Sequence, residues 1–192
     1  MGIKAGVYDS GAGGLTVLKS LIEHKVADNF IYFGDTARAP YGIKSKQTIK
    51  RYAKECSSFL RSKGIDFLAV ACNTVSALAL QDVKETVCRG VIGTIKPIVD
   101  LISSDLTVKK VGIIGTQATI QSCVYEKAIK KLRPDIKVFS LATPLFVSLI
   151  EEGIRDKKVL SAVCSYYLRN FVKENIDLLL LACTHFPLMR ER

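Results

Sequence analysis

One ten-residue stretch occurs twice in this chain, as IDFLAVACNT at residues 65–74 and as IDLLLLACTH at residues 176–185. The two copies align position by position at an offset of 111 residues, which puts Cys183 in the place of Cys72. A second pair, KAGVYDS at 4–10 and KVGIIGT at 110–116, repeats at an offset of 106 residues. Because both pairs run from an apolar segment into polar residues at a similar spacing, they predict two copies of one structural unit.

Short apolar runs alternate with longer stretches of helical period, and this alternation predicts parallel strands joined by crossover helices. The boundary between the copies is expected near Ile95–Asp100, where Lys96-Pro97 interrupts the pattern, and gives units at 1–96 and 97–192. The expected fold class is α/β, with two similar doubly wound parallel-sheet units related by a pseudo-twofold axis and an active site in the cleft between them. The predicted strands are 5–9, 30–34, 67–71, 91–94, 111–116, 138–142 and 178–182.

Two longer segments have the apolar period of an amphipathic helix. Residues 45–63 carry one apolar face that includes Cys56, which we interpret as a core side chain. A second apolar face precedes Lys173 and lies next to Cys164, and it consists of Val159, Val163, Tyr166, Tyr167 and Phe171.

The composition is that of a globular protein, with 48% hydrophobic and 24% charged residues among 192. It excludes a disordered chain, a collagen-like repeat and a small disulfide scaffold. The formal net charge of +10 is spread along the chain without a basic tail. An even basic surface is typical of a soluble protein, and nucleic acid or an anionic substrate is the alternative reading.

The segment that begins Met1-Gly2-Ile3-Lys4 leads directly into a predicted strand and resembles no targeting signal, so we expect a cytoplasmic protein. The most apolar run, 176–183, is too short to cross a membrane, which needs about 20 residues. Six cysteines, at positions 56, 72, 88, 123, 164 and 183, lack CxxC spacing. We therefore predict reduced thiols and no metal site.

The first predicted strand ends in a glycine-rich loop, Asp9-Ser10-Gly11-Ala12-Gly13-Gly14. Glycines allow a close backbone approach to an anion, so this loop is either a phosphate or carboxylate site or only a tight turn. It lacks the Gly-Lys-Ser/Thr ending of a P-loop. The loop at 34–42 has two readings as well: a Pro-Tyr-Gly turn in which Asp35 pairs with Arg38, or a wall of a substrate site.

Cys72 and Cys183 are the most informative residues, although a single strand cysteine is usually a small hydrophobic side chain. Each follows a predicted strand and precedes polar groups, Asn73-Thr74 in one copy and Thr184-His185 in the other. A helix N-terminus or a protonated partner makes a thiolate available near neutral pH. Two equivalent thiols suit proton removal from one face of a carbon and proton return on the other. His185 is a candidate to set the protonation of Cys183, and Asp9 has the matching place beside Cys72, whereas capping and core roles are the alternatives.

With these residues considered, the sequence resembles the glutamate racemases of the aspartate/glutamate racemase superfamily. The motifs that carry the resemblance extend over nearly the whole chain, and they are YDSGAGGLTVL at 8–18, YFGDTARAPYG at 32–42, ACNTVSA at 71–77, GIIGTQAT at 112–119 and LACTHFPL at 181–188.

The resemblance implies a cofactor-independent racemase that interconverts L- and D-glutamate, the latter for bacterial peptidoglycan. It implies that Cys183 takes the α-proton of L-glutamate while Cys72 delivers a proton to the opposite face. Asp9 and His185 would assist Cys72 and Cys183 respectively. Either Glu151 or Glu152 would be a further acid. The implied substrate contacts are Asp9, Ser10, Tyr41, Gly42, Asn73, Thr74, Thr184 and His185.

The sequence departs from the family pattern in two places. Ser148 stands where relatives commonly have Pro, and the sequence stops at Arg192, where family members continue for several dozen residues. We therefore expect exposed apolar surface on the first half and a homodimer. The expected partner is glutamate, with no membrane and no nucleic acid.

Two other functions are kept as alternatives. One is a racemase for aspartate or another acidic amino acid, and the other is an inactive basic binding protein. Pyridoxal-phosphate chemistry is disfavoured because no lysine stands out in a strand-end cluster.

Overall fold

The computed structural model describes residues 2–87 and 90–189, which form two compact units divided between Ile95 and Lys96. The first unit holds β1 (Lys4–Asp9), α1 (Leu15–Glu23), β2 (Asn29–Gly34), α2 (Lys46–Ser62), β3 (Phe67–Val70), α3 (Asn73–Leu78), α4 (Leu80–Val87) and β4 (Gly90–Gly93). Helix α5 (Ile95–Ser104) starts at the division. The second unit continues with β5 (Lys110–Gly115), α6 (Gln117–Gln121), α7 (Val124–Leu132), β6 (Lys137–Ala142), α8 (Pro144–Glu151), α9 (Lys157–Glu174) and β7 (Leu178–Ala182).

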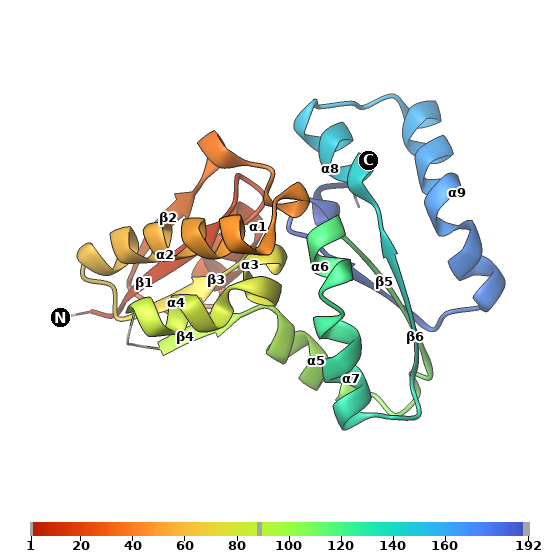
Figure 1. Cartoon of the computed structure of the whole chain (residues 1–192), viewed down its shortest axis with the longest axis horizontal. Coiled ribbons are helices and arrows are strands. Elements are labelled where there is room, and N and C mark those ends of the chain that lie inside the picture. The colour runs from red at the N-terminus through yellow and green to blue at the C-terminus, as the bar shows by residue number, and fades with distance from the viewer. Residues whose placement is uncertain (1, 88–89, 190–192) are drawn as a thin grey trace. The chain divides into compact units, whose positions relative to one another are not determined.

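Each unit is built on one parallel sheet, and this confirms the predicted α/β class. The first sheet has the strand order β2-β1-β3-β4 and the second has the order β6-β5-β7. Strands are added first on one side of the first strand of each sheet and then on its other side. Because the crossovers are right-handed, the helices of these two connections lie on opposite faces of the sheet. Figure 1 shows this in the second unit, where α6 and α7 lie on one side of the sheet and α9 lies on the other.

The internal repeat seen in the sequence is a repeat of strand register. Ala5 pairs with Phe67 in the first sheet, and Val111 pairs with Leu178 in the second, so the two offsets describe one arrangement. The entry to each sheet is also repeated, because an aspartate accepts a backbone hydrogen bond there. Asp66 accepts from the Lys4 N–H at 2.8 Å, and Asp177 accepts from the Lys110 N–H at 2.8 Å.

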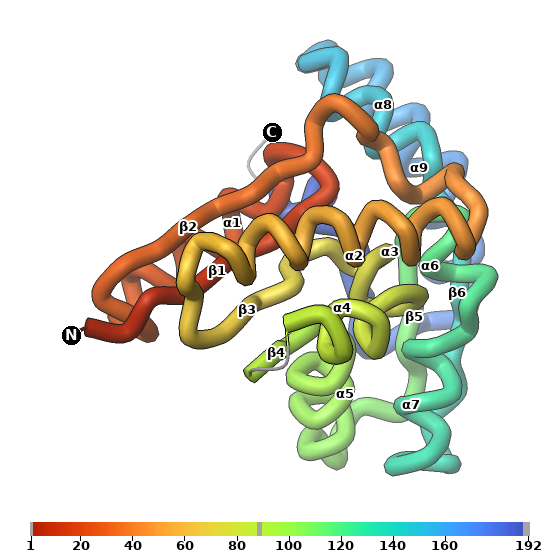
Figure 2. Tube along the Cα trace, turned by 60° about the vertical axis from the view of Figure 1, so that its left-hand side comes forward, coloured from red at the N-terminus to blue at the C-terminus, as the bar shows by residue number. Residues whose placement is uncertain are grey.

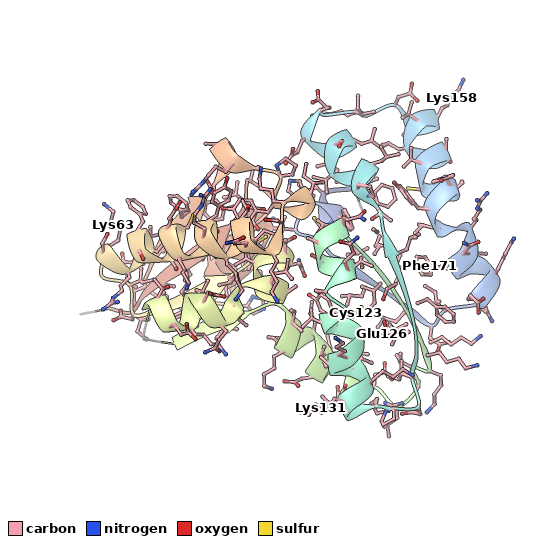
Figure 3. The ribbon with its side chains drawn as sticks, viewed as in Figure 1. Lys63, Cys123, Glu126, Lys131, Lys158 and Phe171 are labelled. Carbon is pink, nitrogen blue, oxygen red and sulfur yellow. The ribbon has the colours of Figure 1, made fainter. Side chains whose placement is uncertain are left out.

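Apolar packing holds helices on both sheets. In the first unit α2 and α4 lie side by side, as Figure 2 shows, and α2 buries Ile49, Ala53 and Leu60. In the second unit Phe171, labelled in Figure 3, reaches from α9 to the sheet, where glycine at position 112 leaves room for its ring. On the side of α2 that faces α4, Lys50 and Lys54 form ion pairs with Asp82, at 3.0 and 3.2 Å.

Two local predictions were wrong. We expected Lys96-Pro97 to interrupt the structural pattern, but both residues lie inside α5, which runs from Ile95 to Ser104. Proline is tolerated in the first turn of a helix, where its missing N–H has no partner within the helix. The predicted stripe on α9 also included two residues that are exposed, Val159 at 42% and Tyr166 at 62%, whereas Leu160, Tyr167 and Phe171 form the buried face.

Helix α1 covers its sheet poorly. None of its residues is buried, and Leu15 and Ile22 are about half exposed, at 49% and 50%. Ile92 on the edge strand β4 is exposed as well. Exposed apolar side chains also occur in the second unit, for example Leu106 at 73% and Val172 at 77%, so apolar exposure does not distinguish the two units.

Five of the six cysteines lie in the described part of the chain, and none of these five forms a disulfide; Cys88 lies outside it. Over residues 2–87 and 90–189, no helix combines the length and the apolar character that a membrane crossing requires.

Candidate active site

The carboxyl ends of β1 and β3 bring the first group of predicted site residues together. Beyond the last paired residues of these strands, the Tyr8 carbonyl accepts hydrogen bonds from the N–H groups of Ala71 and Cys72, at 2.8 and 3.4 Å. The β1–β3 pairing thus continues past both strand ends and holds Cys72 beside the loop that starts at Ser10. The Cys72 thiol donates to the Ser10 hydroxyl at 3.5 Å.

Burial dominates the chemistry of Cys72. Its side chain is 4% exposed, and desolvation raises the pKa of the thiol to about 11, with the negative charge of Asp9 adding to the increase. The hydrogen bond between the thiol and Ser10, and hydrogen bonds with the backbone of Val75 and Thr74, lower this pKa in part. Cys72 is the cap residue of α3, so the N–H groups of Thr74 and Val75 belong to the first helical turn, in which the helix itself supplies no acceptor. Without a substrate, Cys72 is therefore a thiol at neutral pH.

Asp9 and Asn73 are buried polar residues held by their neighbours. The Asp9 carboxylate accepts the Gly11 N–H at 3.0 Å, and the Asp9 carbonyl accepts the Asp35 N–H at 3.1 Å. The Asn73 side-chain oxygen accepts the Thr94 hydroxyl at 3.2 Å. These contacts fix the side chains around Cys72 before any ligand binds.

The loop that follows β2 is fixed by a buried polar cluster. Arg38 Nε donates to Asp35 Oδ2 at 2.7 Å, which confirms the predicted pair. The Tyr41 hydroxyl donates to the same carboxylate and accepts from the Tyr8 hydroxyl at 3.1 Å. Arg38 also donates to Cys56 Sγ at 3.2 Å, so Cys56 takes part in polar contacts and is not only a core side chain. The side chain of Tyr41 is thus engaged in the protein interior.

The second group lies at the carboxyl end of β7. Cys183, 6% exposed, follows this strand, and its sulfur is 3.7 Å from His185 Nδ1. The other ring nitrogen of His185 is 3.0 Å from Glu151 Oε1, at the end of α8. Of the two acids left open by the sequence, Glu151 is the one that reaches the histidine.

The contact with Glu151 assigns one proton of the imidazole. A carboxylate accepts hydrogen bonds, so Nε2 of His185 carries a proton and donates a hydrogen bond to Glu151. In the neutral ring Nδ1 is then the acceptor, and it faces the Cys183 thiol. The arrangement can take the proton of Cys183 and leave a thiolate beside an imidazolium.

The structure thus groups the predicted residues by unit. Asp9, Ser10, Asn73 and Thr74 surround Cys72, while His185 accompanies Cys183 and the buried Thr184 lies between them in sequence. The Tyr41-Gly42 pair lies in the buried turn that follows Asp35.

Sequence reasoning missed Tyr32 and Thr116. Tyr32 donates to the Gly11 carbonyl, and its place two residues before the 34–42 loop was the available signal. Thr116 is the repeat counterpart of Ser10, and it caps α6 by accepting the Thr119 N–H at 3.2 Å.

The described residues at the ends of β3 and β7 do not form a metal site. Over residues 2–87 and 90–189, no cluster of three or more His, Cys, Asp and Glu side chains could hold a metal ion. An open hollow of about 520 Å³ lies at the opposite, amino-terminal ends of β1 and β2 and includes none of the candidate residues.

Comparison with known proteins places this chain in a family. The model of the Asp/Glu/hydantoin racemase family matches residues 15–192. The chain is 48% identical over 188 residues to a glutamate racemase of Aquifex aeolicus, an alignment that covers 98% of this chain and 73% of that protein. It is 45% identical to a glutamate racemase of Geobacter metallireducens, over 96% of this chain and 68% of that protein.

Solved structures agree with the sequence relatives. The crystal structure of glutamate racemase from Francisella tularensis in complex with D-glutamate matches with a TM-score of 0.92 at 41% identity, and covers 98% of this chain and 71% of that one. The chain therefore belongs to the Asp/Glu/hydantoin racemase family, and within it to the glutamate racemases.

Proposed function

We propose that this chain, an amino-acid racemase by family, interconverts L- and D-glutamate without a cofactor, with Cys72 and Cys183 as the two bases. The observation that carries the proposal is the repeat. Each unit presents one buried thiol at the carboxyl end of the equivalent strand. An ionisable side chain lies near each thiol, Asp9 near Cys72 and His185 near Cys183. Racemisation needs one group to remove the α-proton and another to supply a proton on the opposite face.

In the direction from L- to D-glutamate, Cys183 acts as the base. Its thiol proton passes to His185 Nδ1, and the thiolate removes the α-proton of the substrate. Cys72, a thiol at neutral pH because burial and Asp9 raise its pKa, delivers its own proton to the other face. The reverse reaction starts with Cys72 as the thiolate and Cys183 as the thiol.

The difficult step is the loss of a proton from a carbon next to a carboxylate, because charge builds up on the carboxylate oxygens. Fixed donors stabilise such a charge better than water does, since they need no reorganisation. The polar side chains and backbone N–H groups at the two strand ends supply those donors, and they come from Ser10, Asn73, Thr74, Gly42 and Thr184. A net charge of +10 assists the approach of an anionic substrate.

The same proposal includes the setting of the enzyme. Two catalytic thiols have to stay reduced, which favours the cytoplasm. The product D-glutamate is a building block of bacterial peptidoglycan, and we assign the reaction to its supply. The exposed apolar residues of α1, Leu15 and Ile22, support a homodimer. Analytical ultracentrifugation tests the dimer, and a monomer at micromolar concentration contradicts it.

Circular dichroism of the amino acid tests the proposed activity. The purified chain is incubated with L-glutamate and separately with D-glutamate, and both samples are expected to converge on zero ellipticity. Parallel reactions with L-aspartate and L-alanine test the specificity. A signal that decays only with aspartate assigns the chain to another acidic substrate. No decay with any amino acid, together with duplex DNA binding at physiological salt, supports a basic binding protein instead.

A further inference from the structure

Tyr32 makes contacts at the candidate site that the proposed mechanism does not use. It lies on β2 next to β1 in the first sheet, and its hydroxyl donates to the Gly11 carbonyl at 2.5 Å. The same hydroxyl also lies against Gly14, where an added Cβ would come within 3.0 Å of it. One phenol group therefore contacts both ends of the Gly11–Gly14 loop.

The Gly11 peptide is held from its other side as well. Its N–H donates to the Asp9 carboxylate at 3.0 Å, while its carbonyl accepts from Tyr32. The neighbouring strand leaves room for this carbonyl only because position 34 is glycine, since a methyl group there would overlap the Gly11 oxygen. Tyr32 and Gly34 thus define where the loop runs.

The position of this loop decides what Cys72 meets. Ser10 immediately precedes Gly11, and its hydroxyl accepts the Cys72 thiol proton at 3.5 Å. Asp9 accepts the Gly11 N–H, and its negative charge raises the pKa of both the Cys72 thiol and the Tyr32 phenol. Burial and these neighbours raise the pKa of Tyr32, so it remains a protonated donor throughout the neutral range.

We propose that Tyr32 is a positioning residue for the Cys72 half of the reaction. It holds the Gly11–Gly14 loop through its hydroxyl, and the loop in turn holds Ser10 and Asp9 against the Cys72 thiol. This inference rests on the proposed two-thiol racemisation, because it assigns Tyr32 to one of the two proton transfers. The proposal gives Tyr32 a role through the loop only, and not as a base.

The test compares Tyr32→Phe with the wild type by using α-deuterated substrates. Loss of the hydroxyl is expected to lower kcat by about tenfold, the effect of one well-placed hydrogen bond. The deuterium isotope effect on kcat/KM is expected to grow with α-deuterated D-glutamate, because Cys72 removes that deuteron. With α-deuterated L-glutamate, which Cys183 deprotonates, it is expected to stay the same or to shrink. A loss of folded enzyme lowers kcat but leaves both isotope effects unchanged.

Two further variants make the test specific. Gly34→Ala pushes on the Gly11 carbonyl from the β2 side and is expected to show the same substrate-dependent isotope effect. Gly90→Ala meets only an ordinary contact with Phe67, and Tyr166→Phe changes an exposed tyrosine of α9, so both are expected to behave like the wild type.

The outcomes separate the two proposals. A wild-type protein that does not racemise glutamate contradicts the proposed function. An active wild type with a Tyr32→Phe variant that matches it in kcat, or that slows without changing either isotope effect, contradicts the role of Tyr32 alone. Thermal unfolding of each variant checks that it is folded under the assay conditions.

Discussion

The two strand-end thiols share one position in a repeated unit and differ in their neighbours. Cys72 has a carboxylate nearby and a hydroxyl at 3.5 Å, and both burial and charge keep it protonated. Cys183 has an imidazole at 3.7 Å, and Glu151 orients that ring from its far side. A duplicated scaffold thus provides two equivalent locations with different neighbours. In the proposed reaction from L- to D-glutamate, this difference suits the first thiol to donate a proton and the second to accept one.

Removing either thiol tests this comparison most severely. We expect Cys72→Ser and Cys183→Ser each to lower kcat by about 10³-fold, because a serine hydroxyl is far too weak an acid to replace a thiol in proton transfer. The racemisation assay by circular dichroism measures the loss. Cys164→Ser, on α9, serves as the control and is expected to retain activity. Retention of more than about a tenth of the activity in either site variant contradicts the two-thiol mechanism.

The adjacent acids on α8 offer a matched pair for the second strand end. Glu151→Gln removes the negative charge that holds the Nε2 proton of His185, and we expect kcat to fall by about 10–100-fold. Glu152→Gln is expected to have little effect, since it is Glu151 whose carboxylate contacts His185 Nε2. Equal losses in the two variants would falsify the assignment of Glu151 as the partner of the histidine.

The raised pKa of Cys72 predicts how stability depends on pH. The thiol ionises near pH 9 in the unfolded chain and near pH 11 in the folded chain, so its contribution is fully present below about pH 9. The contribution is lost as the pH rises from 9 to 11, because unfolding then releases a proton. We expect this loss to be on the order of 2–3 kcal/mol.

Urea unfolding at pH 8 and at pH 11 measures this effect. The decrease in unfolding free energy over this range should be smaller for Cys72→Ala than for the wild type, because the alanine variant lacks the group that titrates. Equal decreases in both proteins contradict the buried, protonated thiol.

The smallest expected effect concerns the amino-terminal ends of β1 and β5, where the two units make the same contact. Asp177 accepts N–H groups of Lys109 and Lys110, which lower its pKa. Its contribution is therefore present above the ordinary carboxyl pKa and is lost as the pH falls. We expect Asp177→Asn and its counterpart Asp66→Asn to lower the melting temperature slightly and by similar amounts. Differential scanning calorimetry at pH 7 checks this, and a large effect in only one variant contradicts the equivalence of the two strand ends.

Most of the fold could be predicted from the sequence because the repeat carries the register. Strand 178–182 agrees with β7 at both ends, and the other six differ by one residue at one or both ends. The prediction failed where the apolar pattern of a helix did not show which face is buried. On α9 the apolar residues extend around more than one face, so their spacing alone could not separate the exposed Tyr166 from the buried Tyr167.

The candidate site was predictable only as far as strand ends mark it. Cys72, Cys183 and Asp9 follow apolar runs and therefore could be found by position. The choice between Glu151 and Glu152 depends on the direction in which the last turn of α8 faces, and the contact from Tyr32 to Gly11 joins residues 21 positions apart. Such contacts arise from tertiary packing and leave little trace in the local sequence.

Racemisation in D₂O tests the central claim most directly. If two different thiols act on opposite faces, D-glutamate formed from L-glutamate during the first turnovers carries deuterium at Cα, because its new proton comes from Cys72 equilibrated with solvent. The remaining L-glutamate stays largely protiated, and the same asymmetry holds when the reaction starts from D-glutamate. Product that retains the original proton, or deuterium that enters both pools equally from the start, contradicts a mechanism with one thiol on each side of the substrate.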